Sequence, residues 1–206
     1  MNGPAYRIVT ERLVIRCWTP ADAPLLKVAI DESLDHLRPW MPWASEEPQS
    51  VEAKIAILRT WRSKFDSDKD YIYGIFDRAE SKVLGGTGLH THAGPSAREI
   101  GYWIHVAHTR QGLATELAAA LTRVGFEVDG VGRMEIHCDP LNVASAGVPK
   151  KLGYVHEATL RASLWRPADD TFRATMIWTM LKGEAAATPV ATAKVEAYDA
   201  VGKRLL

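Results

Sequence analysis

A short glycine turn, Arg110-Gln111-Gly112-Leu113-Ala114-Thr115-Glu116, constrains the fold of this chain more than any other segment. It follows an apolar run at 100–106, which predicts a strand, and it opens an apolar run at 113–128, which predicts a helix. Glycine lets the backbone pass close to a ligand, and the first N–H groups of a helix have no partner within that helix. The pattern therefore predicts an anion-binding cradle, unless the turn is an ordinary connection.

The segments around this turn predict a mixed α/β fold. Apolar or alternating runs bounded by turn residues are typical of strands, and apolar positions at helical spacing after Ser, Thr or Asn are typical of capped helices. Strands are expected at 13–18, 71–76, 82–90, 98–106, 134–138, 154–161 and 172–181. Helices are expected at 20–30, from 51 onward, at 113–128 and at 143–152. Strands that are antiparallel early and cross over through helices later predict one mixed sheet with flanking helices.

Length and composition favour a single domain. With 206 residues, 47% of them apolar, the chain is long enough for one buried core and short for two. We expect the domain to cover residues 1–181, and the Ala-, Thr- and Pro-rich residues 182–206 to form a flexible or partner-dependent tail. A net charge of zero argues against recruitment of nucleic acid or an anionic membrane. The amino terminus lacks a secretory pattern, so the expected compartment is the cytoplasm.

A second polar motif follows about thirty residues after the glycine turn. It reads Asp139-Pro140-Leu141-Asn142-Val143-Ala144-Ser145 and comes directly after a predicted strand. Asn142 and Ser145 lie one helical turn apart and share a face, and Asn142 is a natural helix cap. Capping explains Asn142 by itself, but it leaves Ser145 without a role. In the helix that follows, Gly147 and Pro149 predict a short or kinked element.

Taken together, the strand, the glycine turn and the second motif resemble the GNAT superfamily of acetyl-coenzyme A dependent N-acetyltransferases. The resemblance extends from about Thr10 to Leu181 and is strongest to the RimJ/RimL branch, which acetylates the amino termini of ribosomal proteins. It implies the acyl-CoA N-acyltransferase fold, in which a mixed central sheet is splayed at the cofactor site and flanked by helices. It also implies that acetyl-CoA is the cosubstrate.

The resemblance implies two groups of coenzyme-binding residues. Main-chain groups of the strand would pair with the pantetheine amides, and those of the turn would bind the pyrophosphate. These residues are Trp103, Ile104, His105 and Val106 on the strand, and Arg110, Gln111, Gly112, Leu113, Ala114 and Thr115 at the turn. Asn142 would bond the coenzyme arm, and Lys151 would reach phosphates unless it belongs to a solvated helix face. Relatives carry Arg or Gln where this chain has Thr109, so the backbone donors of the turn matter most.

Two residues are the implied catalytic groups. Ser145 would lie near the coenzyme sulfur and act as general acid for the leaving thiolate. Glu99, thirteen residues before Gly112, matches the position of a catalytic glutamate in several family members. It is the expected general base and would contact the acceptor amine. An ion pair with Arg98 or another base explains Glu99 as well, and an α-amine with a pKa of about 7.7 to 8.0 needs little help to lose its proton.

The cysteines and histidines show no metal or disulfide motif. Cys17 and Cys138 lack CxxC spacing and lie in apolar runs, so we interpret them as buried thiols. This interpretation favours direct attack of the amine over an acetyl-cysteine intermediate. The seven histidines are scattered without a zinc-binding pattern, so no metal is expected.

A rigid aromatic loop is the expected acceptor wall. Arg38-Pro39-Trp40-Met41-Pro42-Trp43 displays Trp40 and Trp43 between two prolines, and two rings held at low entropy cost suit an acceptor site. Plugging the core is the alternative role for these rings. The expected function is acetyl transfer to a primary amine, preferably a protein or peptide N-terminal α-amine. A small-molecule amine acetyltransferase and a non-catalytic acyl-CoA sensor are the alternatives, and the sequence leaves open whether the protein is a monomer or a homodimer.

Overall fold

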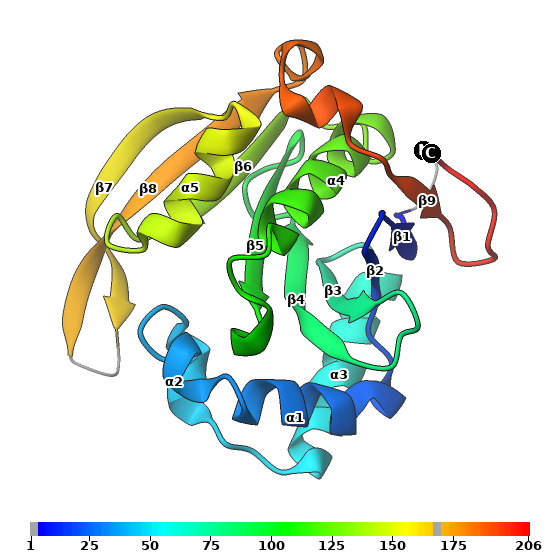
Figure 1. Cartoon of the computed structure of the whole chain (residues 1–206), viewed down its shortest axis with the longest axis vertical. Coiled ribbons are helices and arrows are strands. Elements are labelled where there is room, and N and C mark those ends of the chain that lie inside the picture. The colour runs from blue at the N-terminus through cyan, green and yellow to red at the C-terminus, as the bar shows by residue number, and fades with distance from the viewer. Residues whose placement is uncertain (1–3, 167–169) are drawn as a thin grey trace.

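The computed structural model describes residues 4–166 and 170–206. Within them, one sheet runs through the molecule in the order β7-β8-β6-β5-β4-β3-β2-β1-β9 (Figure 1). The strands are β1 (Arg7–Val9), β2 (Leu13–Cys17), β3 (Tyr71–Asp77), β4 (Val83–His90), β5 (Ala97–Ile104), β6 (Arg133–Cys138), β7 (Val155–Arg166), β8 (Thr171–Leu181) and β9 (Glu196–Tyr198). Neighbouring strands are antiparallel except β5 and β6, which run parallel. The expected mixed α/β fold is confirmed.

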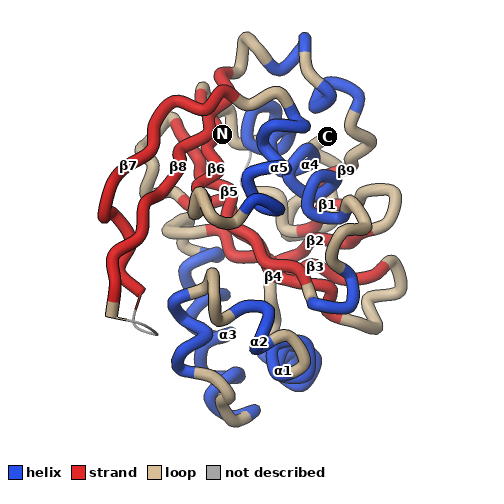
Figure 2. The backbone as a smooth tube through the Cα atoms, turned by 60° about the vertical axis from the view of Figure 1, so that its left-hand side comes forward, coloured by secondary structure: helices blue, strands red, loops and turns tan. Residues whose placement is uncertain are grey.

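Helices cover both faces of the sheet (Figure 2). They are α1 (Ala23–Asp31), α2 (Leu34–Leu37), α3 (Val51–Asp66), α4 (Leu113–Glu127) and α5 (Val143–Leu152). On one face α4 and α5 pack over a core that includes Leu117 and Ile136. On the other face α1 and α3 pack over a second core that includes Trp18, Leu58 and Phe76. The sheet therefore separates two apolar layers.

Local sequence signals explain where the main helices begin. The Ser50 hydroxyl accepts a hydrogen bond from the Ala53 N–H at the start of α3. The Asn142 side chain does the same for the Ser145 N–H at the start of α5. The strand expected to continue to residue 106 ends at Ile104, because the next residues form a 3-10 turn.

The sheet opens between its two parallel strands. β5 and β6 pair only where residues 97–99 lie beside residues 133–135, and their ladder ends there. Beyond it, β5 stays with β4 as far as Ile104, and β6 stays with β8 as far as Cys138. Since α4 contacts β5 and α5 contacts β6, the two helices flank the divergence. This is the splayed sheet that the resemblance implies.

The C-terminal residues differ from the expectation drawn from their composition. Residues 182–206 pack on the domain: Val190 is buried, and β9 pairs antiparallel with β1. The Arg123 guanidinium of α4 donates to the Ala193 carbonyl at 2.8 Å. Small apolar side chains such as Ala197, which is buried, fit against a sheet edge, so an alanine-rich composition here forms packed structure rather than a flexible tail.

Candidate active site

The glycine turn places free backbone donors at the start of α4. Gly112 has a φ of +81°, in the left-handed region that glycine tolerates, and Arg110 before it also has a positive φ of +59°. The first helical hydrogen bond runs from the Glu116 N–H to the Gly112 carbonyl, so the N–H groups of residues 113–115 precede the closed ladder. The positive end of the helix dipole lies at the same point. The turn thus has the donors that a pyrophosphate requires.

A distant arginine, which the sequence patterns did not indicate, lies over this turn. Arg12 donates through Nε to the Glu116 carboxylate at 2.6 Å and through Nη1 to the Gln111 carbonyl at 2.8 Å. A Cβ added to Gly112 would lie 3.5 Å from Arg12 Nη2. Burial raises the pKa of Glu116, but hydrogen bonds from Thr10 and Arg12 outweigh burial and lower it. Glu116 therefore stays ionised and fixes the guanidinium beside the cradle.

The register of β5 decides which backbone groups face the divergence. The His105 N–H donates to the Leu84 carbonyl of the neighbouring β4 at 2.8 Å. Because backbone groups alternate between the two sides of a strand, Trp103 also faces β4, whereas Tyr102 and Ile104 face the opening towards β6. Of the strand residues expected to bind pantetheine, Ile104 is thus correctly oriented, and Tyr102 joins it.

The other two residues expected to bind pantetheine are engaged elsewhere. His105 is buried, with Nε2 3.0 Å from a Glu32 carboxylate oxygen and Nδ1 accepting the Ala107 N–H. The Val106 N–H donates to the Ser33 hydroxyl at 3.1 Å. These contacts tie the end of β5 to the segment between α1 and α2, so both residues have a positioning role.

Ser145 lies across the divergence from β5. Its hydroxyl is 3.1 Å from the Tyr102 hydroxyl. Burial raises the pKa of Tyr102 to about 12, so its phenol keeps its proton at neutral pH. Burial likewise raises the pKa of the Cys138 thiol, which keeps the thiol protonated. A protonated thiol is a weak nucleophile, which supports direct attack by the amine.

The two remaining residues that are expected to bind coenzyme, Asn142 and Lys151, lie at opposite ends of α5. The Asn142 oxygen accepts the Ser145 N–H at 3.1 Å as the cap of α5, and its amide N–H₂ remains a donor. Lys151 is exposed in the last turn of the same helix. It lies six residues beyond Ser145, or about 9 Å along the helix axis from that residue.

Glu99 lies where β5 and β6 part, on the face opposite α4. Its Oε2 is 2.7 Å from Nε2 of His92 and 3.2 Å from Nδ1 of His137. The second ring nitrogen of His137 is 2.8 Å from Glu135. The alternative, a strand carboxylate paired with Arg98 or another base, is therefore also compatible with these contacts: the partners of Glu99 are the two imidazoles, while Arg98 bonds Asp129. No sequence pattern indicated this cluster, since its members come from two strands, β5 and β6, and from the loop after β4.

A third imidazole, that of His90, lies beside this cluster. His90 Nδ1 is 3.0 Å from an Asp70 carboxylate oxygen, and its Nε2 lies 3.0 Å from the position of a Cβ on Gly101. Burial lowers the pKa of His90, but the hydrogen bond and charge of Asp70 outweigh burial and raise it. A side chain at Gly101 would displace this ring, so glycine there lets His90 lie against the sheet.

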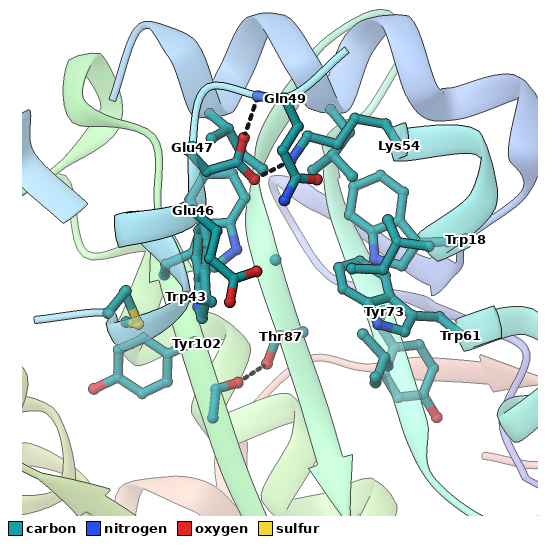
Figure 3. A pocket seen from close by; sticks show the side chains of 18 of the residues that line it. Trp18, Trp43, Glu46, Glu47, Gln49, Lys54, Trp61, Tyr73, Thr87 and Tyr102 are labelled. Atoms are coloured by element: carbon teal, nitrogen blue, oxygen red, sulfur yellow. Dashed lines mark hydrogen bonds and ion pairs between the residues drawn. The ribbon is translucent and has the colours of Figure 1, made fainter. Parts of the chain in front are cut away.

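A cavity of about 460 Å³ occupies the same face of the sheet, below α1 and α3 (Figure 3). It is lined by four tryptophans, several aliphatic side chains and His90, and the tryptophans are Trp18, Trp43, Trp61 and Trp103. Of the two tryptophans expected in the acceptor wall, Trp43 lines this cavity, whereas Trp40 lies outside the lining with its ring centroid 5.7 Å from the Arg173 guanidinium carbon. The Trp103 indole belongs to this cavity rather than to the coenzyme side.

A buried ion pair supports the wall of the cavity. The Lys54 ammonium of α3 bonds the Glu47 carboxylate, which also accepts the Gln49 N–H at 2.9 Å (Figure 3). Lys54 is 2% exposed and Glu47 is 7% exposed. A buried charge needs a partner, so this pair ties the loop after Trp43 to α3.

No three His, Cys, Asp or Glu side chains in residues 4–166 and 170–206 are placed to hold a metal ion. Among the same residues, no helix combines the length and apolar composition needed to cross a bilayer.

The fold and this site define the class of the protein. Residues 12–155 match the family model described as the acetyltransferase (GNAT) domain, which covers more than half of the chain. The chain therefore belongs to the GNAT acetyltransferases, and it is an N-acetyltransferase.

Similar proteins indicate the branch of the GNAT family to which the chain is related. The chain is 28% identical over 158 residues to the uncharacterized N-acetyltransferase YoaA of Bacillus subtilis (strain 168), covering 76% of this chain and 87% of the relative. It is 26% identical over 188 residues to the [ribosomal protein uS5]-alanine N-acetyltransferase of Escherichia coli (strain K12), covering 86% and 95%. Mycobacterium smegmatis RimJ in complex with CoA-disulfide superposes with a TM-score of 0.78 at 21% identity, covering 92% and 91%. These matches confirm the resemblance to the RimJ/RimL branch.

Proposed function

We propose that the protein transfers acetyl from acetyl-CoA to a primary amine, preferably the N-terminal α-amine of a protein or peptide, by direct attack in the cytoplasm. The supporting observation is the position of Tyr102. Its hydroxyl bonds Ser145 on the α5 side, while the adjoining Gly101 and Trp103 line the cavity on the α1–α3 side. One strand therefore separates the coenzyme cradle from an acceptor pocket.

The coenzyme occupies the divergence between β5 and β6 in this proposal. The N–H groups of Leu113, Ala114 and Thr115 bind the pyrophosphate, and the backbone of Ile104 pairs with pantetheine. Both assignments are supported by the free donors at the glycine turn and by the register of β5. Relatives also support the choice of coenzyme, since one similar structure contains acetyl-CoA and others contain CoA.

The catalytic step uses Glu99 and Ser145. The amine nitrogen attacks the thioester carbonyl, the carbon–sulfur bond breaks, and an amide and a thiolate form. Glu99 takes the proton that the amine loses, and it passes that proton on to His92, which is solvent-exposed. The Ser145 hydroxyl donates to the thiolate, and the Tyr102 hydroxyl, 3.1 Å away, orients it. The raised pKa of Cys138 supports this route over an acetyl-cysteine.

A turnover assay tests this function against its alternatives. The protein is incubated with acetyl-CoA and either peptides with free N-termini or small amines such as amino acids and polyamines. We expect release of free CoA thiol and an acetylated N-terminus in mass spectra of the peptides. Turnover confined to small amines would favour a metabolic or resistance enzyme, whereas coenzyme binding without thiol release would favour the sensor.

A further inference from the structure

We infer that the cavity between α1, α3 and the sheet binds a primary amine carried on a large apolar group, such as an aromatic or long aliphatic side chain. This inference rests on the proposed function, because it names the chemistry of the acceptor at the same site. A relative is named as an alanine N-acetyltransferase, and the side chain of alanine is only a methyl group, so the inference separates this chain from that relative.

The volume and walls of the cavity fit a large group. Its 460 Å³ lies within the range of about 300–1,000 Å³ that is typical of small-molecule sites. Apolar side chains from α1, α3, β3 and the loop before α3 form most of the wall together with the four tryptophans, and they are Leu26, Ile30, Met41, Ile57 and Ile72. A methyl or hydroxymethyl group would leave most of these surfaces in contact with water, whereas an aromatic or leucine-like group would bury them.

A glycine of β4, Gly86, makes room for the Trp103 ring at the floor of the cavity. A Cβ added to Gly86 would lie 2.5 Å from the Trp103 indole nitrogen, so glycine lets that ring lie against β4. Trp43 then faces Trp103 with ring centroids 6.2 Å apart. The two indoles form adjacent walls from different segments of the chain, and a flat or branched apolar group fits between such walls.

The charges in the cavity favour a cationic ligand. Among the described lining residues, the carboxylates of Glu46 and Glu47 face the single ammonium of Lys54. Lys54 bonds Glu47, and the Glu46 carboxylate points into the cavity between Trp43 and Thr87 (Figure 3). A protonated amine is attracted by the surplus carboxylate and by the faces of the indoles.

The cavity also reaches the reacting groups. Tyr102 belongs to its lining, and its hydroxyl bonds the Ser145 hydroxyl beyond β5. His90, from the neighbouring strand, is also part of the lining. An amine whose apolar group lies among the tryptophans therefore has its nitrogen at the edge of β5 where the sheet opens, which is the acceptor position in the proposed reaction.

Acceptor preference is the main test. Peptides identical except for an N-terminal Ala, Ser, Leu or Phe are compared by kcat/KM at saturating acetyl-CoA, with 2-phenylethylamine and ethylamine as the free-amine arm. We expect kcat/KM at least about tenfold higher for Leu and Phe than for Ala and Ser, because only the larger groups fill the cavity. Comparison of the peptides with the two free amines shows whether the preferred acceptor is a peptide or a small molecule. Equal or better use of Ala and Ser would overturn the inference.

Two tryptophan variants test whether the preference for large acceptors arises in the cavity. Trp43 is 37% exposed on its loop, so Trp43→Ala removes a wall without emptying the core. It should raise KM for the Phe peptide several-fold more than for the Ala peptide and leave acetyl-CoA binding unchanged. Trp165 is similarly exposed, at 42%, but lies on β7 outside the cavity. Trp165→Ala is the matched control and should leave the Phe-to-Ala ratio unchanged. The same change in the Phe-to-Ala ratio in both variants would contradict the assignment of the cavity as the acceptor site.

Direct binding separates this inference from the proposed function. Binding of 2-phenylethylamine and ethylamine to the protein alone is followed by the emission of its tryptophans, four of which line the cavity. At least tenfold tighter binding of 2-phenylethylamine than of ethylamine supports the inference, even if no acetyl group is transferred. The absence of acetyl transfer to any amine would refute the proposed function alone. Comparable affinity for both amines overturns the inference, and turnover of any amine would still support the function.

Discussion

At the scale of single residues, Ser145 and its neighbours link the two sides of the sheet. The Ser145 hydroxyl lies 3.1 Å from the Tyr102 hydroxyl, and the raised pKa of Tyr102 keeps that phenol protonated. The phenol can therefore donate to the serine oxygen, which leaves the serine proton free to be directed at a developing thiolate. This position gives it a role that helix capping does not explain.

Replacing Ser145 tests that role. Ser145→Ala should lower kcat by about ten- to a thousandfold through the loss of one transition-state hydrogen bond, with little change in acetyl-CoA affinity. Steady-state kinetics and calorimetry measure the two quantities. Cys138→Ala is the control and should keep most of the activity, because a protonated buried thiol takes no covalent part. A wild-type rate for Ser145→Ala would reduce Ser145 to a packing residue.

The Asp70–His90 pair has a pH signature. Burial raises the pKa of Asp70, but the hydrogen bond and charge of His90 lower it below 3.8, while the pKa of His90 is raised above 6.5. Stability from Asp70 is thus lost as the pH falls through its folded pKa, and stability from His90 is lost as the pH rises through its folded pKa. The pair stabilises the fold most in the window between these two values.

We therefore expect Asp70→Asn to lower Tm most near about pH 6 and much less near about pH 9, where His90 is neutral in both proteins. Thermal melts across this range measure the difference. Asp35→Asn is a suitable control, because the Asp35 side chain is fully exposed on α2. A difference in Tm that stays constant from pH 6 to pH 9 would show that the pair contributes no charge interaction.

At the scale of elements, the start of α4 combines a left-handed glycine with free N–H groups and a fixed arginine. Gly112→Asp should abolish measurable acetyl-CoA binding, because it adds bulk and negative charge where the phosphates bind. Calorimetry on the folded variant measures the affinity.

Gly130 offers a matched control for the strain of this substitution. It also has a positive φ, +72°, with no atom within 4 Å of an added Cβ, and it lies after α4 at the other end of the helix. Gly130→Asp introduces the same residue in the same backbone region and should bind acetyl-CoA normally. If Gly112→Asp binds with unchanged affinity, the turn is an ordinary connection.

At the scale of the whole molecule, the C-terminal residues complete the sheet. β9 pairs with β1, Ala197 and Val190 are buried, and the Leu206 carbonyl accepts the Ala197 N–H. Deleting residues 182–206 should lower the free energy of unfolding by at least about 2 kcal/mol, since it exposes the apolar surface that these side chains cover. Chemical denaturation measures the loss. Val201→Ser, at an 87% exposed position of the same segment, should have no effect. An unchanged stability after deletion would restore the flexible-tail interpretation.

The sequence predicted features that depend on short stretches of chain. The turn at Gly112 and the cap at Asn142 are local, so their patterns are readable without a structure. Arg12 was missed because it lies 104 residues from its partner Glu116. Tyr102 was missed, and Trp103 assigned to the wrong side, because only the register with β4 decides which way each residue of β5 faces.

The tail was misjudged for a related reason. A composition rich in Ala, Thr and Pro is typical of mobile segments, but whether such a segment packs depends on an unpaired strand edge elsewhere. That edge belongs to β1, which was itself not predicted, because three residues are too few for a periodic pattern. Pairing partners far apart in the sequence therefore limited the prediction of the fold and of the site alike.

The opening between β5 and β6 has a kinetic consequence. In the proposed reaction, coenzyme and acceptor approach from opposite sides of one sheet, so neither blocks the route of the other. We therefore expect that either substrate can bind first and that the ternary complex forms by both orders of addition. Free CoA should then compete with acetyl-CoA for the glycine turn and leave the amine free to bind, so we expect inhibition by the thiol product rather than by excess acceptor.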